Sequence, residues 1–291
     1  MRGPLIRRVS LAGLAASLVF VAAAQAAGAA GTLYGSYNTP PPNPTTSTLS
    51  TVNVGTGSAT PVGTLPFSPS VGVTEIVCQP NPTSAATAIC YAQASGSARP
   101  DAISQFNLST GAAIGAPVPD GAAPFNGLAY VGSTLYGASQ VLAGPSTLST
   151  LNPVTGASVV IGLTGVGPIT GLAWNGTTMY AIEGTTHSAP GAHLYTINLS
   201  TGAATLVGAT GIEGAGSLQF GPDGNLYAGG DNTDGGHLYR VNQTTGTATL
   251  VGASGFLPSA GLTGLALVTF PNPPPPPPAP AAITVTPSFT G

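Results

Sequence analysis

The sequence contains very little charge and few of the residue types that usually carry chemistry. Only 4% of its 291 residues are charged, and it has two cysteines, one tryptophan and three histidines. Of its five cations, all arginines, Arg2, Arg7 and Arg8 lie within the first eight residues. No basic patch is available to neutralise phosphates, which excludes nucleic acid as a partner.

The first residues are typical of an export signal. Arginines precede the apolar stretch LAGLAASLVFVAAA (11–24), and Ala-Gln-Ala at 24–26 gives the small–x–small pattern of a cleavage site. We expect a signal peptide over 1–26, a lead-in over 27–31, and export to the periplasm, the cell surface or the medium. The apolar run is short for a bilayer, so we expect no membrane span in the mature chain. Two arginines and eight acids then remain, for a net charge of −6.

Glycine and proline are abundant, with 42 and 29 copies, and such a composition approaches that of disordered chains. Hydrophobic residues nevertheless make up 42% of the sequence and recur in register, which a disordered chain does not require. The mature chain is therefore expected to fold as one all-β domain.

The phrase Asn-x-x-Thr-Gly occurs five times, at intervals of 44 to 54 residues. This period matches a four-stranded propeller blade. Asn followed by Thr-Gly is turn chemistry, and alternating apolar residues flank each copy, which predicts a β-hairpin. The five asparagines are Asn53, Asn107, Asn152, Asn198 and Asn242.

Two further strands precede each hairpin, a small-residue-rich strand such as GLAY (127–130) and then a strand such as LYG (135–137). The first copy (33–63) lacks the small-residue strand, whereas the last copy (263–270) has only that strand. Together they complete one blade. We therefore predict a five-bladed β-propeller of four-stranded antiparallel blades over 32–270, whose first blade is closed by the C-terminal strand.

The chain changes character after residue 270. The sequence PNPPPPPPAPAA (271–282) predicts a polyproline II linker, and we expect the tail over 283–291 to be disordered.

The blade sequences, such as LYTINLSTGAATLVG (194–208), resemble secreted bacterial β-propellers with LYxI(D/N)xxTGxAT blades. This broad group includes the streptogramin-lyase-like and quinoprotein-like propellers. The resemblance covers the mature domain and implies the scaffold, while one such fold hosts many activities. The lyase-type members would imply a catalytic histidine with a carboxylate and a divalent metal, and no motif here matches theirs.

Cys78 and Cys90 lie at adjacent ends of two predicted strands of the second blade. An even pair of cysteines in an exported protein predicts a disulfide. A zinc site would need more ligands than two cysteines.

Most of the charge falls at one end of the predicted strands. We call this end the loop face: it carries the connections between the second and third strands of a blade and those from each outer strand to the next inner strand. The other end is the turn face. An alternative explanation is that the connections on the loop face are longer and therefore hold more polar residues. We interpret it as a ligand-binding face, with Glu75 included if that side chain faces the axis; the candidates are Glu75, Arg99, Asp101, Asp120, Glu183, His187, Glu213, Asp231 and Asp234.

Four of these residues could bind a divalent cation, namely Glu183, His187, Asp231 and Asp234. They occupy equivalent connections of neighbouring blades, and polar turns are the alternative. We expect no other cofactor. His193 and His237 recur in Gly-x-His-Leu-Tyr, which suggests a structural role with each imidazole held by a backbone group.

Two functions remain open. The first is a non-enzymatic binding or surface-display propeller, a monomer whose partner is an extracellular protein or glycan. The alternative is a lyase or hydrolase that acts on a carbohydrate or small molecule at the axis, with Glu75 and either Asp120 or Glu213 as paired carboxylates.

Overall fold

The computed structural model describes residues 31–39, 46–67, 72–94, 101–120, 124–139, 144–184, 191–257 and 259–270. The predicted signal peptide, proline-rich linker and tail lie outside the described residues, as do Arg99 and His187.

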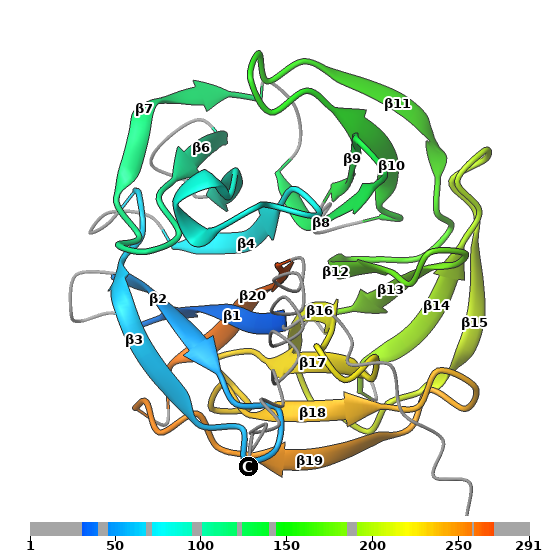
Figure 1. Cartoon of the computed structure of the whole chain (residues 1–291). Coiled ribbons are helices and arrows are strands. Elements are labelled where there is room, and N and C mark those ends of the chain that lie inside the picture. Colours follow the sequence, from blue (N-terminus) through cyan, green and yellow to red (C-terminus); the bar gives the residue numbers. More distant parts are fainter. Residues whose placement is uncertain are drawn as a thin grey trace, which may run out of the picture.

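Five four-stranded antiparallel sheets surround a central axis, which confirms the predicted five-bladed propeller (Figure 1). Blades 1 to 5 follow the chain, and each is counted outward from its inner strand. The inner strands are β20 (Gly261–Thr269), β4 (Val73–Cys78), β8 (Phe125–Val131), β12 (Ile169–Trp174) and β16 (Ala215–Phe220). The second strands are β1 (Gly31–Asn38), β5 (Cys90–Ala94), β9 (Thr134–Ser139), β13 (Met179–Glu183) and β17 (Leu226–Gly230).

The remaining strands build the outer half of each blade. The third strands are β2 (Ser47–Val52), β6 (Ala102–Phe106), β10 (Thr147–Leu151), β14 (His193–Ile197) and β18 (Leu238–Val241). The outer strands are β3 (Ala59–Thr64), β7 (Ala113–Pro119), β11 (Ser158–Leu163), β15 (Ala204–Ala209) and β19 (Ala248–Gly252).

The C-terminal strand closes the first blade as predicted. Strand β20 pairs antiparallel with β1, from Gly31 opposite Thr269 to Asn38 opposite Gly261. The ring therefore closes by hydrogen bonding between the two ends of the domain, and the inner edge of blade 1 is not left open.

Each repeated turn is held by its own asparagine. The side-chain oxygen of Asn198, for example, accepts hydrogen bonds from the backbone N–H groups of Ser200 and Thr201, at 2.8 and 3.2 Å. The glycine that follows, Gly202, has a φ of 81°, a backbone conformation that residues other than Gly, Asn and Asp rarely adopt. Equivalent asparagine contacts occur in the other four copies.

The hydrophobic core lies between the blades rather than within them. Among the described residues there are five hydrophobic clusters, and each joins two neighbouring sheets. The tyrosine of every second strand belongs to a different cluster, so these side chains pack between sheets. They are Tyr34, Tyr91, Tyr136, Tyr180 and Tyr227.

Cys78 and Cys90 form the predicted disulfide. They lie directly opposite each other in the β4–β5 pair, and the connection between them contains a short 3-10 helix, Ala85–Thr87. No helix in the described part of the chain is long and apolar enough to cross a bilayer.

Candidate functional site

The two kinds of loop-face connection meet each other through backbone hydrogen bonds. In blade 2 the N–H of Asp120 donates to the carbonyl of Asp101, at 3.2 Å. In blade 5 the N–H of Asp231 donates to the carbonyl of Gly214, at 2.8 Å. The described acidic residues of this face lie in three separate groups, one each in blades 2, 4 and 5.

The blade 4 group consists of a carboxylate, a histidine and a tyrosine. His193 Nδ1 lies 3.3 Å from Glu183 Oε2, and the Tyr195 hydroxyl donates to the same oxygen at 3.1 Å. Glu183 ends β13, whereas the other two residues alternate along β14, so the register of the two strands brings them together. Burial and the neighbouring Glu183 carboxylate raise the pKa of Tyr195 to about 12.

Blade 5 repeats this arrangement with a carboxylate from its loop. His237 Nδ1 lies 3.5 Å from Asp234 Oδ2, and the Tyr239 hydroxyl also interacts with this carboxylate. Burial raises the pKa of Asp234, and interactions with Tyr239 and His237 offset part of that rise. The exposed Glu213 lies close enough to raise the pKa of Tyr239 further.

The described residues of blades 1 to 3 contain no such group, although these blades share the repeat. The position of Tyr195 and Tyr239 is occupied there by serines, namely Ser50, Ser104 and Ser149. Each imidazole lies beside a carboxylate rather than the backbone group that the sequence suggested. The sequence already shows this departure from the repeat, because two neighbouring blades have tyrosine where the other three have serine. It distinguishes blades 4 and 5 from the rest.

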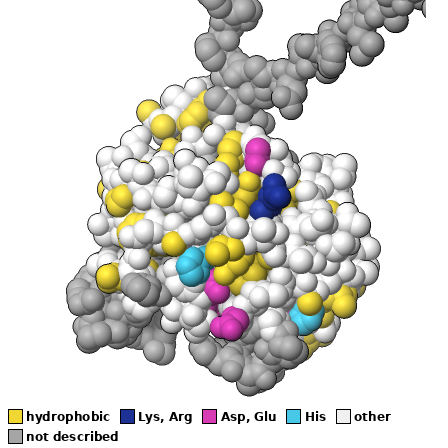
Figure 2. Space-filling view, turned by 90° about the horizontal axis from the view of Figure 1, so that it is seen from below, with side chains coloured by type: hydrophobic (Ala, Val, Ile, Leu, Met, Phe, Trp, Pro, Cys, Tyr) yellow, Lys and Arg dark blue, Asp and Glu magenta, His cyan; other side chains and the backbone are white. Residues whose placement is uncertain are grey.

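A pocket of about 430 Å³ opens next to the blade 5 group. The Phe256 ring forms part of its wall and stacks on Tyr37 of blade 1, with ring centroids 4.5 Å apart and planes inclined by 22°. Figure 2 shows one side of the molecule, on which hydrophobic side chains gather in a band with histidine and acidic side chains at its border. The pocket is lined by Thr233, Asp234, Gly235, His237, Ala253, Ser254, Gly255 and Phe256.

Glu75 occupies the axis but is closed off from solvent. Its side chain is 0% exposed, and Oε1 accepts hydrogen bonds from the N–H groups of Ile76 and Leu265, at 3.0 and 3.1 Å. Burial raises its pKa well above the usual value. The inner strands of the other blades carry small residues at the same position, namely Gly127, Gly171, Ser217 and Gly264.

Asp120, the second carboxylate of blade 2, is also buried. Its Oδ2 accepts a hydrogen bond from Gln93 Nε2, at 2.6 Å. Burial raises the pKa of Asp120, the Gln93 hydrogen bond lowers it, and the nearby Asp101 raises it again. Gln93 was not among the residues that the sequence pointed to, because a lone glutamine in a strand carries no motif.

Three of the four residues predicted to bind a cation lie in the described part of the chain, and each of the three has other partners there. Glu183 and Asp234 have histidine and tyrosine partners within their own blades, and Asp231 accepts hydrogen bonds from Thr233. The described residues contain no group of three or more His, Cys, Asp or Glu that could hold a metal. His187 lies outside them, so the cation site stays a prediction.

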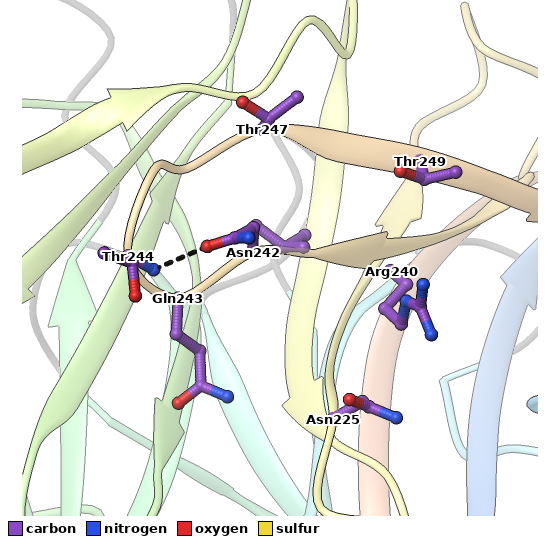
Figure 3. A pocket seen from close by; sticks show the side chains of 8 residues that line it. Asn225, Arg240, Asn242, Gln243, Thr244, Thr247 and Thr249 are labelled. Atoms are coloured by element: carbon purple, nitrogen blue, oxygen red, sulfur yellow. Dashed lines mark hydrogen bonds between the residues drawn. The ribbon is translucent and has the colours of Figure 1, made fainter.

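The turn face carries a groove that the sequence did not point to. It measures about 370 Å³ and is lined by side chains of blade 5, with Arg240, Gln243 and Asn225 along one side (Figure 3). The Asn242 side chain is engaged in its own turn, where it accepts from the backbone of Thr244, as in every other blade. Arg240 and Gln243 are peculiar to blade 5. Threonine or glutamine stands at the Arg240 position in the other blades, and valine, leucine or proline stands at the Gln243 position.

No protein-family model and no curated protein matches the sequence. Solved structures do match. A chain of a nidogen/laminin complex is 8% identical, with a TM-score of 0.51 over 82% of this chain and 98% of that chain. A protein of unknown function from Bacteroides caccae is 13% identical, with a TM-score of 0.42 over 75% of this chain and 71% of that chain. At such identities, the first of these similarities shows the fold alone.

Proposed function

We propose that the protein is an exported, non-catalytic binding propeller whose ligand occupies the pocket beside Asp234, His237 and Phe256. The residues that the scaffold needs are those that recur in every blade. The carboxylate–histidine–tyrosine groups of blades 4 and 5 are not needed by the scaffold, because blades 1 to 3 fold with serine at the tyrosine position. Their placement on one face of neighbouring blades, with the blade 5 group beside a pocket, is the observation that carries the proposal.

The chemistry of the pocket fits a saccharide. A sugar ring has apolar C–H faces and hydroxyl edges, and the pocket offers one aromatic ring and several polar groups. The partly buried Phe256 ring is held by its stacking on Tyr37, so little entropy is lost when a ligand packs on it. Asp234 and His237 supply an acceptor and a second polar group at the pocket edge. The volume lies in the range of small-molecule sites, about 300–1,000 Å³.

The residues near the propeller axis support a hydrolase function less well than the blade 5 pocket supports binding. Glycoside hydrolysis needs two carboxylates on either side of a bond that substrate can reach. Glu75 is fully buried, and the inner strands pack so closely that a Cβ on Gly264 would lie 2.6 Å from the backbone nitrogen of Ile76. A sugar ring has no room beside Glu75 unless these strands separate.

A glycan array with the fluorescently labelled mature protein tests the proposal. We expect a defined set of glycans to bind, and Asp234→Asn and His237→Ala to weaken binding at least tenfold. Thr147→Ala is the matched control, because it changes the equivalent third-strand position in blade 3, and its binding should equal that of the wild type. The absence of any bound glycan, or equal binding by the two pocket variants, would overturn the proposal.

Mass spectrometry of each bound glycan after incubation separates binding from catalysis. An unchanged glycan supports the binding function. A cleaved product that disappears in the Asp234→Asn variant would replace it with the lyase or hydrolase alternative.

A further inference from the structure

Three buried side chains with oxygen atoms form a row at the loop-face end of blade 2. Glu75, Gln93 and Asp120 are 0%, 0% and 3% exposed. Glu75 and Gln93 lie directly opposite each other in the β4–β5 pair, so their side chains project from the same side of the sheet. Gln93 continues the row through its 2.6 Å hydrogen bond to Asp120. The row therefore runs from the inner strand to the connection that enters blade 3.

Each of these side chains retains one oxygen without a donor. Glu75 Oε2, Gln93 Oε1 and Asp120 Oδ1 are buried, and none accepts a hydrogen bond of normal geometry from the described residues. The backbone amide of Leu128 in the neighbouring blade lies near the Glu75 carboxylate but does not complete such a bond. Buried acceptors that lack donors are costly, and native proteins satisfy them with a hidden water or an ion.

Among the described residues, the surroundings of this row add negative charge and supply no cation. Arg240 is the one lysine or arginine in the described ranges, and it lies in β18 of blade 5. A further negative charge nearby is Asp101, whose carbonyl accepts from the Asp120 backbone and whose carboxylate raises the pKa of Asp120. Two buried carboxylates and an amide oxygen thus lie in one row without a cation among the described residues.

We propose that Glu75, Gln93 and Asp120 bind a divalent cation of the calcium class. Their free atoms are all carboxylate or amide oxygens, the ligands that Ca²⁺ prefers, and the row contains none of the imidazole or thiolate ligands that favour zinc. Ca²⁺ tolerates an irregular shell of six to eight oxygens, so water molecules complete the coordination on the side of Asp101. The site is separate from the glycan pocket of blade 5 and does not depend on the function proposed for it.

This cation would tie three parts of the ring together. Glu75 belongs to the inner strand β4, Gln93 to β5, and Asp120 to the connection between blades 2 and 3. A shared ion neutralises carboxylates that otherwise repel one another in a buried place, so binding is coupled to folding and stabilises the native state.

The experiment measures thermal unfolding of the mature protein after treatment with EDTA and dialysis. Addition of CaCl₂ should raise Tm progressively with concentration, and metal analysis after dialysis against CaCl₂ should find one Ca²⁺ per chain. Asp120→Asn and Glu75→Gln should bind no Ca²⁺ and show no rise in Tm. Asp223→Asn, which changes an acid on the turn face, should respond as the wild type does.

Terbium luminescence gives a second readout, because Tb³⁺ replaces Ca²⁺ and is sensitised by nearby tyrosines. We expect luminescence from the wild type that Ca²⁺ displaces and that Asp120→Asn abolishes. Should Glu75→Gln fail to fold, Asp120→Asn decides the question, since it keeps an acceptor for Gln93. The absence of any Ca²⁺ effect on the wild type would overturn the proposal and indicate that a proton on Glu75 neutralises the row. A Ca²⁺ response that survives in Asp120→Asn would overturn it as well.

Discussion

Gly57 in the turn of blade 1 lies against Gly252 in the outer strand of blade 5. A Cβ on Gly57 would lie 2.5 Å from the carbonyl oxygen of Gly252. The same relationship joins Gly202 to Gly162 and Gly246 to Gly208, with 2.6 Å in both pairs. The turn of one blade therefore packs against the final glycine of the preceding blade's outer strand. A Cβ on that glycine would in turn collide with the turn, as it would on Gly252 against the carbonyl oxygen of Thr56.

Substitution of Gly208 by alanine should destabilise the protein although Gly208 has no positive φ. Its Cβ would collide with the backbone carbonyl of Thr245. We expect the free energy of unfolding to fall by about 1–3 kcal/mol, the usual cost of overpacking. Gly55→Ala is the control, because a Cβ on that exposed glycine would meet only the side-chain oxygen of Asn53, at 3.3 Å, and its effect should stay within about 0.5 kcal/mol. Urea unfolding measures both, and equal effects would contradict this account of the repeat.

Truncation tests the closure of the ring. A chain that ends at residue 260 lacks β20, and with it the partner of β1 and the buried Leu262 and Leu265. We expect it to lose cooperative thermal unfolding, because blade 1 and two inter-blade clusters are left incomplete. A chain that ends at residue 270 keeps every described strand pair and should show the Tm of the full mature chain. Cooperative unfolding of the shorter chain would contradict the closure.

Removal of the disulfide should cost stability without changing the fold. Cys78 and Cys90 enclose a loop with a sequence separation of 12 residues. The Cys78→Ser, Cys90→Ser variant should lose roughly 3 kcal/mol on the chain-entropy model. Denaturant unfolding with and without a reductant checks this, since the reductant should lower wild-type stability to that of the variant and leave the variant unaffected.

The turn-face Asp223 predicts a pH dependence of defined sign. Partial burial alone would raise the pKa of Asp223, but hydrogen bonds from Asn225 and Tyr227, at 2.7 and 2.8 Å, outweigh it and hold the pKa below 3.8. A carboxyl whose pKa is lowered by folding stabilises the native state above its unfolded pKa, and this contribution is lost as pH falls through the folded pKa.

Asp223→Asn should therefore reduce the free energy of unfolding at pH 7 by about 1 kcal/mol, a value discounted for the exposure of this turn. The difference from the wild type should shrink as pH falls below the unfolded pKa and through the lowered folded pKa of Asp223, because a protonated aspartate is neutral like asparagine. Unfolding curves across this range measure it. A difference that does not change with pH would show that the charge of Asp223 is irrelevant.

The sequence alone determined the scaffold, because the turn residues and the alternating apolar residues of each blade are local features of the sequence. Asn198 with Gly202 specifies one turn whatever surrounds it, and five such turns at a blade's spacing leave one fold. The incomplete first and last copies likewise determined the closure of β20 on β1, since only their union completes a sheet. Adjacent strand ends also identified the disulfide between Cys78 and Cys90.

Only the tertiary structure decided which polar groups meet. Gln93 carries no motif, yet strand register places it opposite Glu75 and the blade 2 connection brings Asp120 to its amide. The partner of His237 is a carboxylate from its own loop, and the Phe256 ring reaches the pocket only because blades 5 and 1 meet at the closure. Repeats encode the contacts that every blade makes, whereas a site depends on side-chain contacts across sheets, which no local sequence pattern specifies.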